Sequence, residues 1–208
     1  MTGTAGDGAI RRLRAAVDRL TEFNRDRTPT GLTHDDADEV VGTAASDDAF
    51  GFDPFPLLRA LHDAGARVVV IGQVAGILHG STELTGDLDL LWDGDTDQAP
   101  ALAAAFARVG AMLSDDRGAA IACTAQAFTL PKIQFRSPSA SGDCCTPALP
   151  WGPLPVTEFL RRCQIAVADD GTVIRYLDRD DLIRMRRATG RVKDLRRAEE
   201  LRFRGSMP

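Results

Sequence analysis

Aromatic side chains are scarce in this 208-residue chain: they make up 6% of it, with one Tyr and two Trp. Proteins that bind single-stranded nucleic acid by stacking successive bases need several aromatic rings on one surface. We therefore do not expect base stacking to be the main device of this protein. The net charge of −5 likewise excludes a polycation that coats DNA or membranes without specificity.

Long apolar runs are also absent. No stretch reaches the roughly 18 consecutive apolar residues that a membrane-spanning helix requires, and residues 1–10 lack the apolar centre of a secretory signal. The four cysteines form no CxxC pair, and the three histidines are scattered, which argues against a zinc site. These absences predict a reduced, cytoplasmic protein that does not associate with membranes.

The content of apolar residues, at 44%, is sufficient for a hydrophobic core and excludes wholesale disorder. We expect an N-terminal helix and acidic loop over residues 1–50, followed by one domain over residues 51–208. Charge is distributed unevenly, because residues 175–204 hold eleven Lys or Arg against six Asp or Glu. A basic C-terminal segment beside an acidic body indicates phosphate handling, or simply a solvated helix face.

Periodicity and caps predict an α/β fold with a mixed sheet, flanked by helices and ending in a helical C-terminal segment. Pro131 and Pro138 are expected to limit the strands near them to edges or turns. Asp178 and Asp181 are spaced like a capping box at the start of a helix. The expected helices cover residues 8–24, 53–65, 73–79, 97–109, 156–162, 178–190 and 191–204; the expected strands are 67–71, 87–91, parts of 119–137 and 143–147, and a hairpin of 164–168 with 172–177.

The most informative stretch is residues 68–92, VVVIGQVAGILHGSTELTGDLDLLW. A β-branched strand runs into Gly72, and a helix begins at once. The start of a helix leaves unpaired N–H groups and the positive end of the helix dipole, which suit a phosphate. A loop of small residues that includes Ser81 follows the helix and leads into the next strand.

Two acidic residues, Asp87 and Asp89, begin that next strand. Successive side chains of a strand alternate between its faces, so both carboxylates point the same way while Leu88 and Leu90 point toward covering helices. Two carboxylates on one face are costly unless a cation lies between them. Mg²⁺ suits this position because it prefers oxygen ligands and bridges phosphates.

Glycine followed by a Gly-Ser loop and Asp-X-Asp at this spacing resembles the nucleotidyltransferase superfamily of the polymerase-β type. The nearer resemblance is to AbiEii-like and minimal nucleotidyltransferases, many of them toxin–antitoxin or abortive-infection components. A second block, DLIRMRRATGRVKD at residues 181–194, is similar to that family's DLIxxKxxxGRxKD signature. The two blocks lie in the family's order, and the resemblance covers about residues 55–201.

The resemblance implies transfer of a nucleotidyl group from an NTP to a hydroxyl, with release of pyrophosphate. It makes Asp87 and Asp89 the ligands of Mg²⁺ or Mn²⁺ and implies a third catalytic carboxylate, for which Asp143 is the candidate. The residues that it places near phosphate or acceptor are Gly72, Gln73, Ser81, Arg186, Arg191 and Lys193, with Asp194 orienting one of the last two. The implied partners are an NTP, an RNA 3′ end (tRNA among them) or a protein hydroxyl as acceptor, and a cognate antitoxin.

Four positions depart from the family pattern. Gln73 follows Gly72 where the family has Gly or Ser, Glu83 stands where an Arg is common, and Arg186 replaces the Lys of the late block. Cys145 falls where the third acid is expected, with Asp143 two residues earlier on the same face of a strand. Cysteine is a poor ligand for Mg²⁺, so Asp143 is the candidate substitute. The alternative is that Asp143 is a turn residue after Gly142.

Two other functions are compatible with the sequence. The departures at these four positions are also expected in a catalytically degenerate relative, one that binds nucleotide or a protein partner without turnover. The acidic residues 35–39 could instead attract a cationic small molecule, as in antibiotic nucleotidyltransferases.

Overall fold

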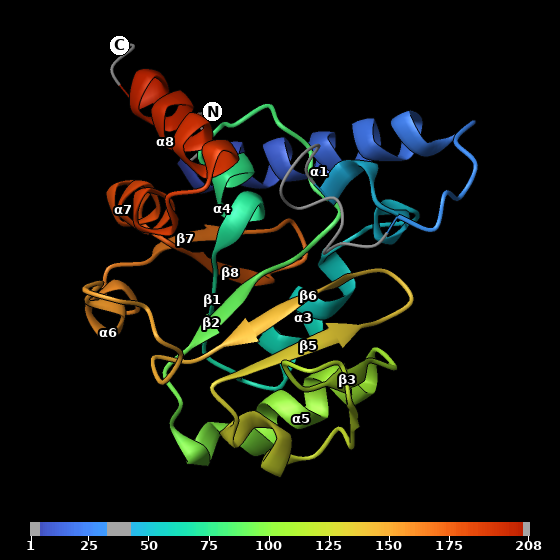
Figure 1. Cartoon of the computed structure of the whole chain (residues 1–208), viewed down its shortest axis with the longest axis vertical. Helices are drawn as coiled ribbons and strands as arrows, with labels where there is room; N and C mark the ends of the chain where they lie inside the picture. The colour runs from blue at the N-terminus through green and yellow to red at the C-terminus, as the bar shows by residue number, and fades with distance from the viewer. Residues whose placement is uncertain (1–4, 33–42, 206–208) are drawn as a thin grey trace.

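The computed structural model describes residues 5–32 and 43–205, and the predicted acidic cluster at residues 35–39 lies outside this part (Figure 1). It confirms the α/β fold, with a single mixed sheet of eight strands in the order β4-β3-β5-β6-β2-β1-β8-β7. The strands are β1 (Val68–Val70), β2 (Leu90–Trp92), β3 (Met112–Ser114), β4 (Ala120–Ile121), β5 (Lys132–Arg136), β6 (Ser141–Cys145), β7 (Gln164–Val167) and β8 (Val173–Tyr176).

Helices surround the sheet and supply the C-terminal end of the described chain (Figure 1). The α-helices are α1 (Ala5–Asn24), α3 (Phe55–Asp63), α4 (Gly72–Leu78), α5 (Ala99–Arg108), α6 (Val156–Phe159), α7 (Arg179–Thr189) and α8 (Val192–Gly205). Short 3₁₀ turns cover Thr43–Ala45, Asp47–Ala49, Thr96–Gln98 and Ala125–Thr129. Helix α1 packs against α4 and β7, and α7 packs against both α4 and α8.

Strand directions bring four chain segments to the same end of the sheet. Strand β1 is parallel to β8 and antiparallel to β2, and β2 is parallel to β6. Consequently β1 and β8 finish at the end where β2 and β6 begin. Helix α4 follows β1 there, and α7 follows β8, so both helices start beside the residues that precede β2 (Figure 1).

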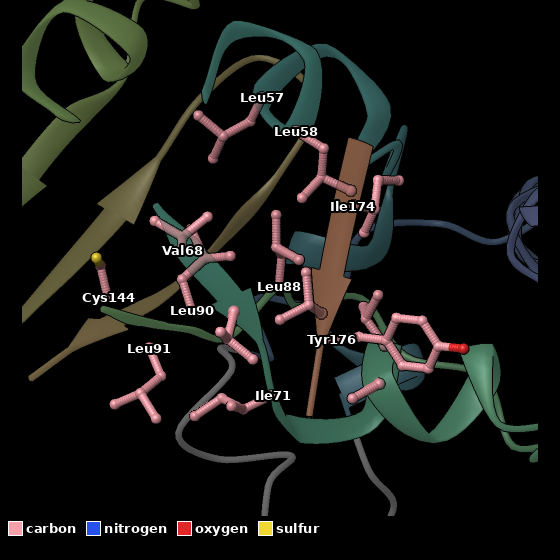
Figure 2. Packing of buried hydrophobic residues seen from close by; sticks show 14 of the residues in the cluster. Leu57, Leu58, Val68, Ile71, Leu88, Leu90, Leu91, Cys144, Ile174 and Tyr176 are labelled. Carbon is pink, nitrogen blue, oxygen red and sulfur yellow. The ribbon is translucent and has the colours of Figure 1, made fainter. Parts of the chain in front are cut away.

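The apolar face of the central strands packs on α3. Leu88 and Leu90 are fully buried, as their alternation with the two aspartates predicts. They cluster with Leu58 of α3 and Ile174 of β8 (Figure 2). Burying a leucine side chain contributes about 1.5–3 kcal/mol, so this face fixes which side of the segment the carboxylates occupy.

Several predicted elements are confirmed. The hairpin forms as β7 and β8, and Asp178 caps α7 by accepting a hydrogen bond from the Asp180 N–H at 2.9 Å. The N-terminal helix also forms, and its buried residues Leu13 and Leu20 belong to the same hydrophobic core as the sheet. The four cysteines form no disulfide in the structure.

Other predictions need correction. The strand expected over residues 87–91 begins only at Leu90, so Asp87 and Asp89 lie just before it. Strand β5 is interior, between β3 and β6, because Pro131 precedes it and Pro138 follows it without occupying a ladder position. Asp181 does not close a capping box, because its carboxylate binds Arg162 Nε at 3.1 Å.

Strand β3 was not expected from the sequence, and the helix expected over residues 156–162 is shorter, because α6 ends at Phe159. Strand β3 has only three residues and an exposed Met112, so its alternation gives little local signal. Within the two described parts of the chain, every helix is too short or too polar to cross a membrane.

Candidate functional site

The candidate site lies where β1 ends and β2 begins. Gly72 is the first residue of α4 and has a φ of +63°, a backbone conformation that residues other than glycine rarely adopt. A β-carbon at this position would overlap the Asp89 carboxylate. The neighbouring Ile71 N–H donates to the Asp89 carbonyl at 2.9 Å, which continues the β1–β2 ladder and holds the two segments together. Glycine is therefore required here for close approach.

The other member of the DxD pair, Asp87, is buried, with 8% of its surface exposed. The Thr85 hydroxyl donates a hydrogen bond to its carboxylate. Leu88, between the two aspartates, donates its N–H to the Ser141 carbonyl at 2.8 Å. Thr85 and β6 together fix the backbone and the first carboxylate of the DxD segment.

Strand β6 contributes the third carboxylate. Gly142 packs so closely on the Leu88 carbonyl that a β-carbon would overlap it, which lets β6 approach the DxD segment. Leu90 of β2 pairs with Cys144 of β6, and the two strands are parallel. Asp89 and Asp143, which directly precede this pair, are therefore neighbours. The structure thus brings together the three carboxylates that the sequence analysis proposed as catalytic.

Lys132 of β5 was not singled out from the sequence, but it contacts this group. Its Nζ lies 2.8 Å from Asp143 Oδ2. Lys132 pairs with Cys145 in the β5–β6 ladder, and Cys145 is 4% exposed. Burial and the nearby charge of Asp143 raise the pKa of the Cys145 thiol, so the position expected to carry an acid holds a neutral, buried group.

The three carboxylates repel one another. Burial raises the pKa of Asp89 well above its ordinary value, and the charges of Asp87 and Asp143 raise it further. Lys132 and Arg191 act in the opposite direction, so both cations are near enough to the carboxylate to stabilise its charge. An additional cation beside Asp89 would relieve the remaining repulsion.

Arg191 and Asp194 belong to the late sequence block and lie at the junction of α7 and α8. Arg191 Nε is 2.6 Å from Asp194 Oδ2, and Thr189 Oγ1 donates to the same oxygen at 2.8 Å. Asp194 is therefore placed to orient Arg191, as expected. Lys193 is 8% exposed, and burial together with the charge of Arg197 lowers its pKa to about 8.

Three residues assigned to phosphate lie together in a buried network. Gln73 Nε2 donates to Ser81 Oγ at 3.0 Å, and Arg186 Nη2 donates to Gln73 Oε1 at 2.6 Å and to the Gly72 carbonyl at 3.2 Å. Burial and the charge of Arg197 lower the pKa of Arg186 to about 10, which leaves it charged at neutral pH. These contacts join α4 to α7, and phosphate binding by Gln73, Ser81 and Arg186 stays a prediction.

The charge reversal at Glu83 is compensated within the chain. Its carboxylate binds Arg197 Nε at 2.8 Å and Arg196 Nη2 at 2.9 Å. Glu200 of α8 likewise accepts hydrogen bonds from Ser81 Oγ at 2.8 Å and from the Thr82 N–H at 3.1 Å. The loop between α4 and β2 is therefore fastened to α8 by two carboxylates, a role that the sequence analysis missed.

The donor set suits a divalent cation only in part. Asp87 and Asp89 provide the oxygen ligands that Mg²⁺ prefers, and the repulsion at Asp89 favours a cation. Across residues 5–32 and 43–205, however, no three Asp, Glu, His or Cys side chains are gathered to hold a metal ion. The protein thus offers two carboxylates, and further ligands would come from nucleotide phosphates and water.

A cavity of about 450 Å³ opens beside the third carboxylate. It lies over β3, β5 and β6, on the side of Asp143 away from Gly72 and α4. Its lining combines apolar and polar side chains from these strands, among them Met112, Ser114, Gln134, Arg136 and Asp143. This cavity is large enough to receive part of a second substrate.

No protein-family model matches the sequence. A search of curated protein sequences likewise finds no significant match.

Proposed function

We propose that this chain is a nucleotidyltransferase-fold protein that uses Mg²⁺ or Mn²⁺ to transfer a nucleotidyl group from an NTP to a hydroxyl. The observation that carries the proposal is the convergence of Asp87, Asp89 and Asp143 beside Gly72. Asp87 and Asp89 would hold the cation. When bound, the cation would neutralise phosphate charge and lower the barrier to displacement of pyrophosphate.

The remaining roles belong to this chain's own residues. Arg191, oriented by Asp194, would bind phosphate oxygens near Asp89. Asp143 borders both Asp89 and the 450 Å³ cavity, so it would accept the proton of an acceptor hydroxyl bound there. The cavity lies on the side of Asp143 opposite Gly72, so the acceptor hydroxyl would reach the α-phosphate from the side of Asp143 while pyrophosphate leaves.

The acceptor that we propose is a hydroxyl of RNA or of a protein in the cytoplasm. Excess positive charge in residues 175–204 favours RNA, although several of these arginines are already engaged. Arg187 and Arg202 bind Glu199, and Arg196 and Arg197 bind Glu83. A function in a toxin–antitoxin or abortive-infection pair would add a cognate antitoxin as a partner.

A label-transfer assay tests the proposal. Purified protein, Mg²⁺ or Mn²⁺ and each α-³²P NTP in turn would be incubated with total RNA and with lysate protein, and the products resolved on gels. We expect label in an RNA or a protein band, and its loss in Asp87→Ala/Asp89→Ala. The matched control is Asp97→Ala/Asp116→Ala, which removes two exposed carboxylates elsewhere and should retain transfer. Absence of both transfer and metal-dependent NTP binding would overturn the proposal.

Nucleotide binding without turnover is a second candidate, and the Lys132–Asp143 contact favours it. The Lys132 ammonium lies 2.8 Å from the Asp143 carboxylate, which would otherwise serve as the base. The buried Cys145 thiol cannot replace that carboxylate. Metal-dependent NTP binding with no label transfer would support this candidate. Transfer acquired by Cys145→Asp, in a protein that otherwise lacks it, would identify the missing acid as the cause.

A further inference from the structure

Lys132 is held beside the candidate site by the strand ladder. In the antiparallel pairing of β5 and β6, Lys132 lies opposite Cys145 and Gln134 lies opposite Asp143. Residues two apart in a strand share a face, so Lys132 reaches diagonally to Asp143 on the face that also carries Cys145. The Thr146 N–H donates to the Pro131 carbonyl at 2.8 Å and fixes the start of β5.

The Lys132 ammonium and the Asp143 carboxylate form an ion pair, with Nζ 2.8 Å from Oδ2. About a quarter of each side chain in the pair is exposed, so the contact is only partly screened by water. Asp143 is thus neutralised by a fixed cation of the protein.

Asp143 and Asp89 are the carboxylates between which a second divalent cation would have to lie. They occupy adjacent positions on neighbouring parallel segments, and the Lys132 ammonium lies 2.8 Å from Asp143 Oδ2. A second divalent cation at that place would meet the Lys132 ammonium at short range. Like charges at such a distance repel strongly in a partly buried site.

We propose that Lys132 is a positioning residue whose ammonium takes the place of a second divalent cation, so that the site holds one cation on Asp87 and Asp89. This inference rests on the proposed function, because it concerns the same metal site. It also gives Asp143 a defined partner: the lysine keeps the carboxylate beside the acceptor cavity when no second cation is present.

Counting Mn²⁺ ions tests the proposal without measuring activity. Mn²⁺ would be titrated into the full chain with a non-hydrolysable NTP analogue, and free Mn²⁺ measured by electron paramagnetic resonance. We expect one ion per wild-type chain and two per chain in Lys132→Met, with the second ion lost again in Lys132→Met/Asp143→Asn. Lys132→Arg keeps the charge and should bind one ion. Lys132→Gln, which removes the charge but retains a hydrogen-bond donor, covers the case in which Lys132→Met fails to fold.

A matched control is an ion pair remote from the site. Arg108 of α5 binds Asp63 of α3 at 2.7 Å, so Arg108→Met removes a paired cation elsewhere and should leave the count at one. Two ions in the wild-type chain, or a single ion in both folded Lys132→Met and Lys132→Gln, would overturn the inference while leaving the proposed function intact. No analogue-dependent Mn²⁺ binding in any variant would overturn the proposed function and this inference together.

Discussion

Gly72 and Asp89 lie in direct contact at the junction of β1 and β2, with no room for a β-carbon between them. The two residues are seventeen positions apart and belong to different sequence motifs, a glycine turn and a DxD pair. Their contact makes the backbone turn and the carboxylate one unit. Changes at either residue should therefore affect the other.

We expect Gly72→Ala to damage both stability and the metal site. The left-handed conformation costs an alanine about 1–2 kcal/mol, and overlap with Asp89 adds to this. Gly110→Ala is a matched control, because Gly110 has a similar φ of +66° with no atom near its absent β-carbon. Urea denaturation should show a larger loss of unfolding free energy in Gly72→Ala, with metal-dependent NTP binding lost only there. Equal losses in both variants would disprove the role of the Asp89 contact.

Glu83 should matter more through Arg197 than through Arg196, although its carboxylate binds both. The Arg197 side chain is 7% exposed, whereas that of Arg196 is 68% exposed. Glu83→Gln removes the carboxylate that hydrogen-bonds the buried guanidinium and leaves the more distant Asp194 Oδ1, at 4.0 Å, as its acidic partner. We expect a loss of about 1–3 kcal/mol in unfolding free energy. Arg196→Gln removes an exposed ion pair and should cost less than about 1 kcal/mol. Chemical denaturation of both variants would measure the difference, and a larger effect of Arg196→Gln would contradict this assignment.

Stability should depend on pH through Lys193. Its pKa is lowered to about 8 in the folded chain by burial and the charge of Arg197, so between that pH and the ordinary lysine value the unfolded chain binds more protons. This group therefore opposes folding at pH 7, and its contribution to stability improves as the pH rises from about 8 to about 10. We expect Lys193→Met, which has no group that titrates in this range, to lack this increase in stability with pH. Thermal melts of both proteins at pH 7 and at pH 9.5 would test it, and parallel pH profiles would refute it.

The four thiols should fall into two classes of reactivity. Cys144 and Cys145 are 1% and 4% exposed, and burial raises the pKa of both, so neither should react with a thiol reagent in the native chain. Cys123 and Cys163 are partly exposed and should react. In Cys123→Ser/Cys163→Ser, Ellman's reagent should give no colour with the folded chain and should react with both remaining thiols once denaturant unfolds it. Rapid native reaction of that variant would contradict the burial of Cys144 and Cys145.

Much of the local structure could be predicted from the sequence because its signals are local. The apolar period of α1, the Asp178 cap of α7 and the Asp169-Asp170-Gly171 turn each depend on residues within a few positions. Alternation also predicts that Asp87 and Asp89 lie opposite the buried Leu88 and Leu90. The short strand β3 escaped prediction because three residues give too few alternations.

By itself the sequence determined the α/β fold, the glycine turn after β1 and the placing of two carboxylates on one face of the segment that leads into β2. Only the tertiary structure decided that Lys132 neutralises Asp143, and that Gln73 and Glu83 bind arginines more than a hundred residues away. Turns, caps and alternation follow from short-range backbone geometry, which each segment carries in its own residues. Ion pairs between distant segments depend on strand order and helix docking, which the packing of the whole core sets.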